Sequence, residues 1–193
     1  MGLWHFSDDG EIGVFEPRAV RVPVERPEGQ EWLNGPLVWA IDDMHSILYL
    51  FPRECPRIVV WPTPATLEED RRAWLGDTAA RAVAFVEQSW AERLSEATIH
   101  RYEMPPHTFE DTGDVGMWVS RSAVTPSSTN SLTNLPASLE KAGVELRIQA
   151  SLTQLRPVWK SSLHASGIRL RNAAGWGKPA WTHSKPGRST PLT

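Results

Sequence analysis

Three places in the 193-residue sequence carry side chains that can take part in binding or catalysis. They are His5 in the first apolar segment, Trp39 and Tyr49 at the two ends of a second one, and the loop acids Glu110, Asp111 and Asp114. An imidazole exchanges a proton near neutral pH, an aromatic ring stacks on a flat ligand, and a carboxylate stabilises developing positive charge. Each place also has a structural alternative: a hydrogen-bonded core or surface histidine, aromatic core packing, and a solvated loop.

Several familiar kinds of active site have no signature in this sequence. The six histidines are scattered without an H-x-x-x-H spacing, and the single cysteine, Cys55, forms neither a C-x-x-C pair nor an internal disulfide. No Gly-rich phosphate loop and no G-x-S-x-G motif is present, which argues against nucleoside triphosphate chemistry and serine hydrolysis. We expect no metal site, a buried Cys55 and a reducing, cytoplasmic location. No apolar stretch approaches the roughly 20 residues of a membrane-spanning helix, so no membrane partner is expected.

The densest apolar segment, residues 37–61, predicts the centre of the core. Residues 37–41 and 58–61 are rich in β-branched and aromatic types, which is typical of strands buried on both faces. Between these strands, Asp42 or Asp43 is expected to start a helix, because an aspartate side chain accepts hydrogen bonds from the first backbone N–H groups. The apolar stripe of this helix would consist of Met44, Ile47, Leu48 and Phe51.

The rest of the pattern predicts an α+β fold. Further strands are expected over residues 3–6, 98–104, 117–120 and 144–148. Helices are expected over 67–95, as one broken helix or two with Ala79, Val83, Val86, Trp90 and Leu94 on the apolar side, and near 132–139 and 152–159. We therefore predict a single α+β domain over 1–172, with mixed or antiparallel split sheets and peripheral helices. Residues 16–36 contain four prolines and predict an extended connection that could act as a lid.

Charge is distributed unevenly along the chain. The net charge is −3, yet the last 43 residues hold seven lysines and arginines and no acid, while the other 150 hold 13 basic and 23 acidic residues. Residues 173–193 are expected to form a basic, disordered tail. Such a tail could contact nucleic acid or an acidic partner, and it could equally be a solvated end.

Seven phrases spread over residues 3–173 resemble a family of bacterial proteins known only as a domain of unknown function. They are LWHFSDD, FEPR, VWAIDDMH, FPRECPR, WVSRSAVTP, GVELR and IRLRNA. This resemblance implies no activity. The residues after Asn172 look like an addition to the pattern.

A second resemblance is to the ADP-ribosyltransferase-like fold, in particular the small rifampin ADP-ribosyltransferases and, more distantly, the RNA 2′-phosphotransferases. These proteins open with a strand carrying a histidine, here His5 in LWHF; continue with an aromatic-Ala strand, here Trp39 in VWAIDDMHSILYL; and later carry a loop acid, here Asp111. The sequence departs from the family where Phe6 stands in place of a glycine and where Trp39 replaces the usual tyrosine. The resemblance implies that the histidine and the aromatic ring cradle NAD, and that the acid stabilises an oxocarbenium ion.

Two hypotheses follow for function. The first is an NAD-dependent ADP-ribosyltransferase or related enzyme acting on a small-molecule or nucleotide substrate, with His5 and Asp111 as catalytic candidates and His5, Trp39 and Tyr49 as cofactor-binding candidates. The second is a noncatalytic binding module, whose tryptophan-rich surface and basic tail bind another macromolecule. The sequence does not reveal the oligomeric state.

Overall fold

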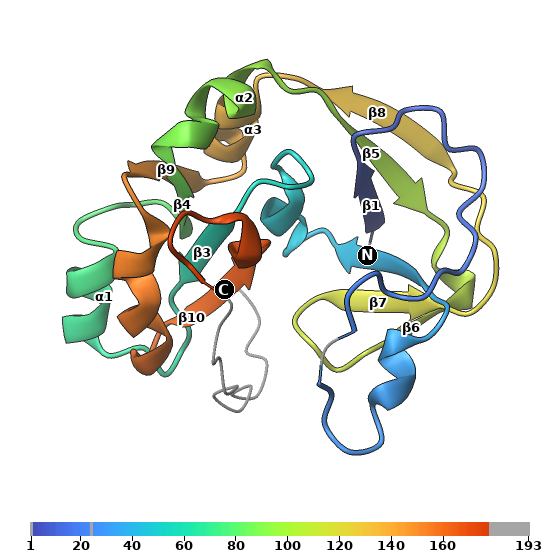
Figure 1. The fold of residues 1–193 in the computed structure, drawn as a ribbon, viewed down its shortest axis with the longest axis horizontal. Helices are drawn as coiled ribbons and strands as arrows, with labels where there is room; N and C mark the ends of the chain where they lie inside the picture. Colours follow the sequence, from blue (N-terminus) through green and yellow to red (C-terminus); the bar gives the residue numbers. More distant parts are fainter. Residues whose placement is uncertain (1, 24, 178–193) are drawn as a thin grey trace. The chain divides into compact units, whose positions relative to one another are not determined.

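The chain forms two compact units in the computed structural model, which describes residues 2–23 and 25–177 (Figure 1). Unit 1 comprises Met1–Ser46 and His100–Ser131. Unit 2 comprises Ile47–Ile99 and Leu132–Thr193. The chain therefore leaves unit 1 after its second strand and returns to it later, and each unit is built from two separate segments.

Unit 1 is built on a six-stranded sheet with the order β6-β7-β2-β1-β5-β8. The strands are β1 (Leu3–Ser7), β2 (Val38–Asp42), β5 (Ile99–Met104), β6 (Phe109–Asp111), β7 (Met117–Ser120) and β8 (Ser128–Leu132). All pairings from β6 across to β5 are antiparallel. The expected strands at residues 3–6, 37–41, 98–104 and 117–120 are confirmed. Strand β8 is not among the strands that the sequence predicts, because its Ser/Thr/Asn side chains are mostly exposed and carry no apolar signal.

The two faces of this sheet pack against different segments. Directly opposed residues on antiparallel strands point to the same face, and successive residues along a strand point to opposite faces. One face carries a cluster formed by Leu3, Phe15, Val38, Ala40, Tyr102, Met104 and Val124. The other face carries Val119 with Leu33 and Leu37, partly covered by the 3-10 segment η1 (Glu31–Asn34). Residues 16–36 are joined to the residue before β2 by an isolated antiparallel bridge between Arg18 and Leu37.

Unit 2 is built on a four-stranded mixed sheet with the order β10-β3-β4-β9. The strands are β3 (Arg57–Trp61), β4 (Ala82–Glu87), β9 (Val144–Gln149) and β10 (His164–Ile168), and only the β4–β9 pairing is parallel. Every residue of β3 and β4 is buried. Apart from the buried charged residues Arg57 and Glu87 at their ends, both strands are unbroken apolar runs, as expected of strands with two covered faces.

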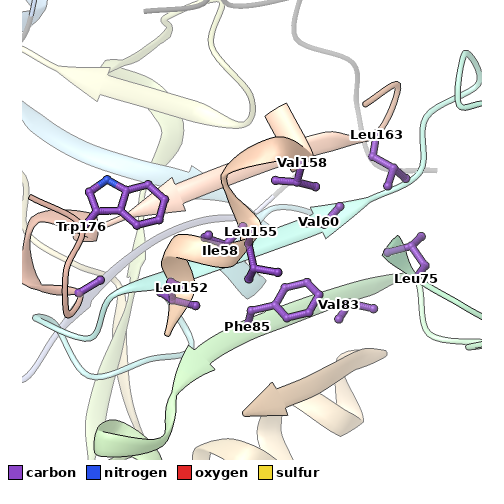
Figure 2. Packing of buried hydrophobic residues seen from close by; sticks show 11 residues of the cluster. Ile58, Val60, Leu75, Val83, Phe85, Leu152, Leu155, Val158, Leu163 and Trp176 are labelled. Carbon is purple, nitrogen blue, oxygen red and sulfur yellow. The ribbon is translucent and has the colours of Figure 1, made fainter. Parts of the chain in front are cut away.

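Short helices surround this sheet. The α-helices are α1 (Glu68–Trp74), α2 (Ala91–Glu96) and α3 (Leu135–Lys141), and the 3-10 segments are η2 (Ser46–Tyr49), η3 (Gln88–Trp90), η5 (Leu152–Lys160) and η6 (Leu170–Asn172), with η4 (Pro106–Thr108) in unit 1. Figure 2 shows that Leu152, Leu155 and Val158 of η5 pack over β3 and β4. The α+β class with separate sheets is confirmed.

Two of the expected helices are wrong. The segment after Asp42 forms only the single 3-10 turn η2, because Ile47, Leu48 and Phe51 are all buried and are not arranged as one stripe of a surface helix. The expected helix across Ala79–Leu94 is interrupted by β4. The run Ala82–Glu87 contains two valines and a phenylalanine, and its match to a helical period was coincidental.

The C-terminal boundary of the globular part lies later than expected. Ala173 and Trp176 are buried in the unit 2 core, with Trp176 only 3% exposed. The expected tail therefore begins no earlier than Lys178, and the remaining part of that prediction lies outside the described residues. Strand β10 was also missed, because its sequence, HASGI, has no clear alternation. No helix in the described chain is long and apolar enough to cross a membrane.

Candidate functional site

The three residues expected to share a pocket lie on one sheet of unit 1. His5 is on β1, Trp39 on the neighbouring β2, and Asp111 on the edge strand β6. A ring nitrogen of His5, Nδ1, lies 2.8 Å from the carbonyl oxygen of Trp39. Asp111 is paired with Trp118, which is paired in turn with Ala40. The fold thus brings together strands that are far apart in sequence.

The side chains of these residues do not all point to the same face. Asp111 shares a face with Ala40 through their common partner on β7, and His5 shares that face because Leu3, two residues away, is paired with Asp42. Trp39 precedes Ala40 and therefore points to the opposite face. A ligand lying flat on one face cannot contact the imidazole, the indole and the carboxylate together.

His5 and Asp111 sit in very different surroundings. The His5 ring is half-buried and lies 4.6 Å, between ring centroids, from Phe15 in the apolar cluster. This matches the hydrogen-bonded core histidine that the sequence left open as an alternative. Asp111 is exposed, and its carboxylate accepts a hydrogen bond from the backbone N–H of Gly113 at 2.8 Å. A catalytic role for either residue stays a prediction.

Tyr49 belongs to unit 2. The guanidinium carbon of Arg57 lies 5.6 Å from the Tyr49 ring centroid and 5.1 Å from that of Phe51. Arg57 is 2% exposed, and it donates hydrogen bonds to the carbonyl oxygens of Leu48 and Cys55. Burial lowers the pKa of Arg57 to about 10. These contacts give Tyr49 a place in a buried cation–aromatic cluster, and its role in cofactor binding stays a prediction.

Trp39 has a partner that the sequence did not suggest. The guanidinium of Arg26, from the proline-rich segment 16–36, lies 5.8 Å from the Trp39 ring centroid. The indole Nε1 of Trp39 and the guanidinium Nε of Arg26 are both buried, and neither has a hydrogen-bond partner among residues 2–23 and 25–177. Buried donors are normally paired, so two adjacent unpaired donors require an explanation. Nothing in the spacing of Arg26 indicates this contact.

In a second arginine–tryptophan pair of unit 1, the guanidinium Nε has an acceptor. The guanidinium of Arg121 lies 4.3 Å from the Trp32 ring centroid, and its Nε donates to a Glu110 carboxylate oxygen at 2.8 Å. Glu110, one of the three loop acids, is therefore part of an ion pair. The Trp39–Arg26 pair differs in that both of its buried donors lack an acceptor in the described part of the chain; Arg101 Nε, in the Arg101–Trp4 pair of unit 1, is a further buried donor without one.

A pair formed by the half-buried Asp42 and the buried His45 lies at the end of β2. Asp42 Oδ1 accepts from the backbone N–H of His45 and lies 2.8 Å from its ring Nδ1. Burial alone would raise the pKa of Asp42, but the hydrogen bonds from His45 outweigh it and lower the pKa below its ordinary value. The His45 ring, 4% exposed, packs against Gly116 in the β6–β7 loop. The D-x-x-H spacing was the only sequence signal for this pair.

Metal and thiol chemistry find no support in the part of the chain that the structure describes. No group of three or more His, Cys, Asp or Glu side chains there could hold a metal ion. Cys55 is buried, and burial raises the pKa of its thiol to about 11. A thiol with a raised pKa is a poor nucleophile, because the reactive species is the thiolate.

Comparison with known proteins identifies the family of this chain. A family model described as a family of unknown function (DUF6886) matches residues 4–173. The chain belongs to this family. The match covers Trp39, Arg26, Asp111 and the Asp42–His45 pair, and it ends before the buried Trp176. No curated protein matches the DUF6886 chain, and no solved structure matches it. No comparison supports the resemblance to ADP-ribosyltransferases.

Proposed function

We propose that unit 1 binds a nucleotide ligand of the NAD type, with Trp39 and Arg26 as the binding side chains. The observation that carries this proposal is the pair of adjacent buried donors without acceptors. A buried donor left unpaired costs about 1–3 kcal/mol, and an oxygen-bearing ligand would remove that cost. Phosphate oxygens suit a guanidinium, and a flat heterocycle suits an indole.

The segment that supplies Arg26 fits this role. Residues 16–36 were expected to act as a lid, and Arg26 lies in that segment directly against the predicted ring-binding residue. Unit 1 has only five lysines and arginines against 13 acids. An anionic ligand therefore depends on a local cation, and Arg26 is the one placed beside Trp39.

Ligand-dependent melting tests the proposal. NAD or ADP-ribose in excess is expected to raise the melting temperature of the full chain. A ligand concentration of 100 times Kd adds about 2.7 kcal/mol to the free energy of unfolding. Arg26→Gln is expected to abolish this rise, and Trp39→Phe, which keeps a ring but removes the N–H, to reduce it. Arg121→Gln is the matched control, since Arg121 also stacks on a tryptophan but already has its acceptor. No shift with either ligand, or equal shifts in the Arg26 and Arg121 variants, would refute the proposal.

A transferase activity is the narrower proposal, and Asp111 is the residue on which it depends. Its exposed carboxylate lies on the same sheet, but on the face opposite Trp39, so the ligand would have to reach around the edge strand β6. Asp111→Asn is expected to abolish NAD turnover, measured as nicotinamide release, while leaving NAD-induced stabilisation unchanged. Turnover that survives this substitution would leave a binding module without a role for Asp111.

A further inference from the structure

Positive charge is concentrated in unit 2. This unit holds 15 lysines and arginines against 10 acids, and no acid occurs after residue 150. Unit 1, with five basic residues and 13 acids, has the opposite sign. A polyanion approaching this protein is therefore attracted to unit 2.

A cluster of arginines gathers around one carboxylate in this unit. Arg169 Nε lies 3.6 Å from one Glu54 carboxylate oxygen, and Arg171 Nη2 lies 3.7 Å from the other. Arg169 also donates to the backbone oxygen of Arg53, which places a third guanidinium-bearing residue beside them. The side chains of Arg169 and Arg171 are 30% and 50% exposed. Arg169 and Arg171 share the one Glu54 carboxylate, so this carboxylate balances only one of their two positive charges.

The Glu54 carboxylate is already occupied on both oxygens. The side-chain amide of Asn172 donates to Glu54 Oε2 at 3.0 Å and to its backbone oxygen at 2.8 Å. The hydrogen bond from Asn172, together with Arg169, Arg171 and Arg53, lowers the pKa of Glu54 despite its partial burial. Glu54 thus remains ionised, and it holds the two guanidinium groups together while offsetting one of their two charges.

The chain that follows this cluster is fixed to the unit 2 core. The carboxylate of Glu87, 2% exposed, accepts from the backbone N–H groups of Leu152 and Ala174. Arg156 donates to the backbone oxygen of Trp176, and its guanidinium lies 4.9 Å from the ring centroid of this buried residue. The described chain is therefore fixed to the unit 2 core as far as Trp176.

We propose that the surface formed by Arg53, Arg169 and Arg171 binds the phosphodiester backbone of nucleic acid. Guanidinium groups bind phosphate oxygens in a two-pronged geometry, and several cations along one surface match the repeated charges of a nucleic-acid strand. Because none of these contacts reads a base edge, the binding is expected to be independent of base sequence. The proposal rests on unit 2 alone and does not depend on nucleotide binding by unit 1.

Fluorescence anisotropy with the full chain tests this surface. The probes are a labelled single-stranded RNA and a labelled DNA duplex of mixed sequence, titrated between about 50 and 200 mM salt. The double variant Arg169→Gln/Arg171→Gln is expected to weaken binding to both probes at low salt by about tenfold, and to make the slope of log K against log salt shallower by about 1.4–1.8. The control is Arg71→Gln/Arg72→Gln in α1, because these exposed arginines also share one carboxylate, that of Glu68.

Five outcomes would overturn the proposal. The first four are no binding of either probe at low salt, equal losses in the two double variants, an unchanged salt slope in the Arg169/Arg171 variant, and binding of an acidic polyglutamate peptide as tight as that of RNA. The variant Arg169→Lys/Arg171→Lys keeps both charges and guards against a folding defect in the glutamine variant. The lysine variant is expected to keep the wild-type salt slope with a modest loss of affinity. A salt slope as shallow as that of the glutamine variant would refute the proposal.

Discussion

The two sheets of this protein differ in how much of their surface is available for chemistry. In unit 2, the central strands β3 and β4 are buried along their whole length. In unit 1, the central strands β1 and β2 contain both buried and half-buried residues. A sheet covered on both faces can contribute to function only through its edges and loops. The half-covered sheet can present side chains from within its strands, which is why Trp39 is a candidate binding residue and Val59 is not.

The units also differ in the sign of their charge, and this separates the two proposed ligands. The negative net charge of unit 1 repels an anionic nucleotide. Added salt screens this repulsion, and this offsets the loss of attraction to Arg26, so nucleotide binding is expected to depend little on salt. Nucleic-acid binding by the basic unit 2 releases counterions and weakens steeply with salt. The two activities are therefore expected to respond differently to ionic strength in the same preparation.

The largest expected effect is a loss of folding stability, and it appears when the removal of a buried arginine is compared with the removal of a half-buried one. Arg57→Ala in unit 2 removes three hydrogen bonds to backbone carbonyls and leaves a cavity beside Tyr49 and Phe51, so we expect a loss of about 3–5 kcal/mol. Arg101→Ala in unit 1 removes a guanidinium that lies 4.1 Å from the Trp4 ring centroid, with an expected loss of about 1 kcal/mol. Urea unfolding of both variants measures the difference. Similar losses would show that the two units tolerate the removal of an arginine equally.

A smaller effect compares two glycines with the same backbone conformation. Gly116 in unit 1 and Gly76 in unit 2 have φ values of 63° and 68°. An added Cβ at Gly116 would collide with the His45 ring, whereas at Gly76 it would meet nothing within 4 Å. We expect Gly76→Ala to cost about 1 kcal/mol through backbone strain and Gly116→Ala about 2–3 kcal/mol, measured by thermal melting. Equal costs would mean that the β6–β7 loop moves freely away from His45.

The smallest effect concerns the acid side of the stability curve. The pKa of Asp42 is lower in the folded protein than its ordinary value of 3.8, so the unfolded chain binds more protons in acid. The stabilisation from this carboxylate is therefore fully present above pH 4 and is lost as pH falls through its folded pKa. Asp42→Asn is expected to lose stability at pH 7 and to flatten the decline below pH 4, relative to the wild type. A parallel decline in both proteins would contradict this role.

Sequence patterns predicted the sheets better than the helices, for a physical reason. Strands such as β3 and β9 are specified by local runs or alternation, and both were found where expected. The sequence did not predict β4, because an apolar run of five residues, 82–86, satisfies a helical period as easily as a strand. The exposed strand β8 was missed, since an edge strand with polar side chains is defined by its pairing with β5 and not by its composition.

The candidate site could be predicted only in part. The sequence selected Trp39 as a binding residue, but the face to which it points depends on the register with β7, which is a tertiary property. Arg26 could not be found at all, because a contact between an irregular segment and a strand leaves no periodic signal. The separation of His5 from Trp39 onto opposite faces likewise follows from pairing alone.

The interrupted order of the chain has a consequence for its synthesis. The last strand of unit 1 ends near residue 131, whereas Glu87 receives its partner from Ala174 only after a further 40 or so residues have been made. At ribosomal rates of about 5–20 residues per second, a delay of about 2–8 s separates these events. During that interval the buried carboxylate and the apolar surface under Trp176 stay uncovered in the nascent chain, which makes this period the most vulnerable to aggregation.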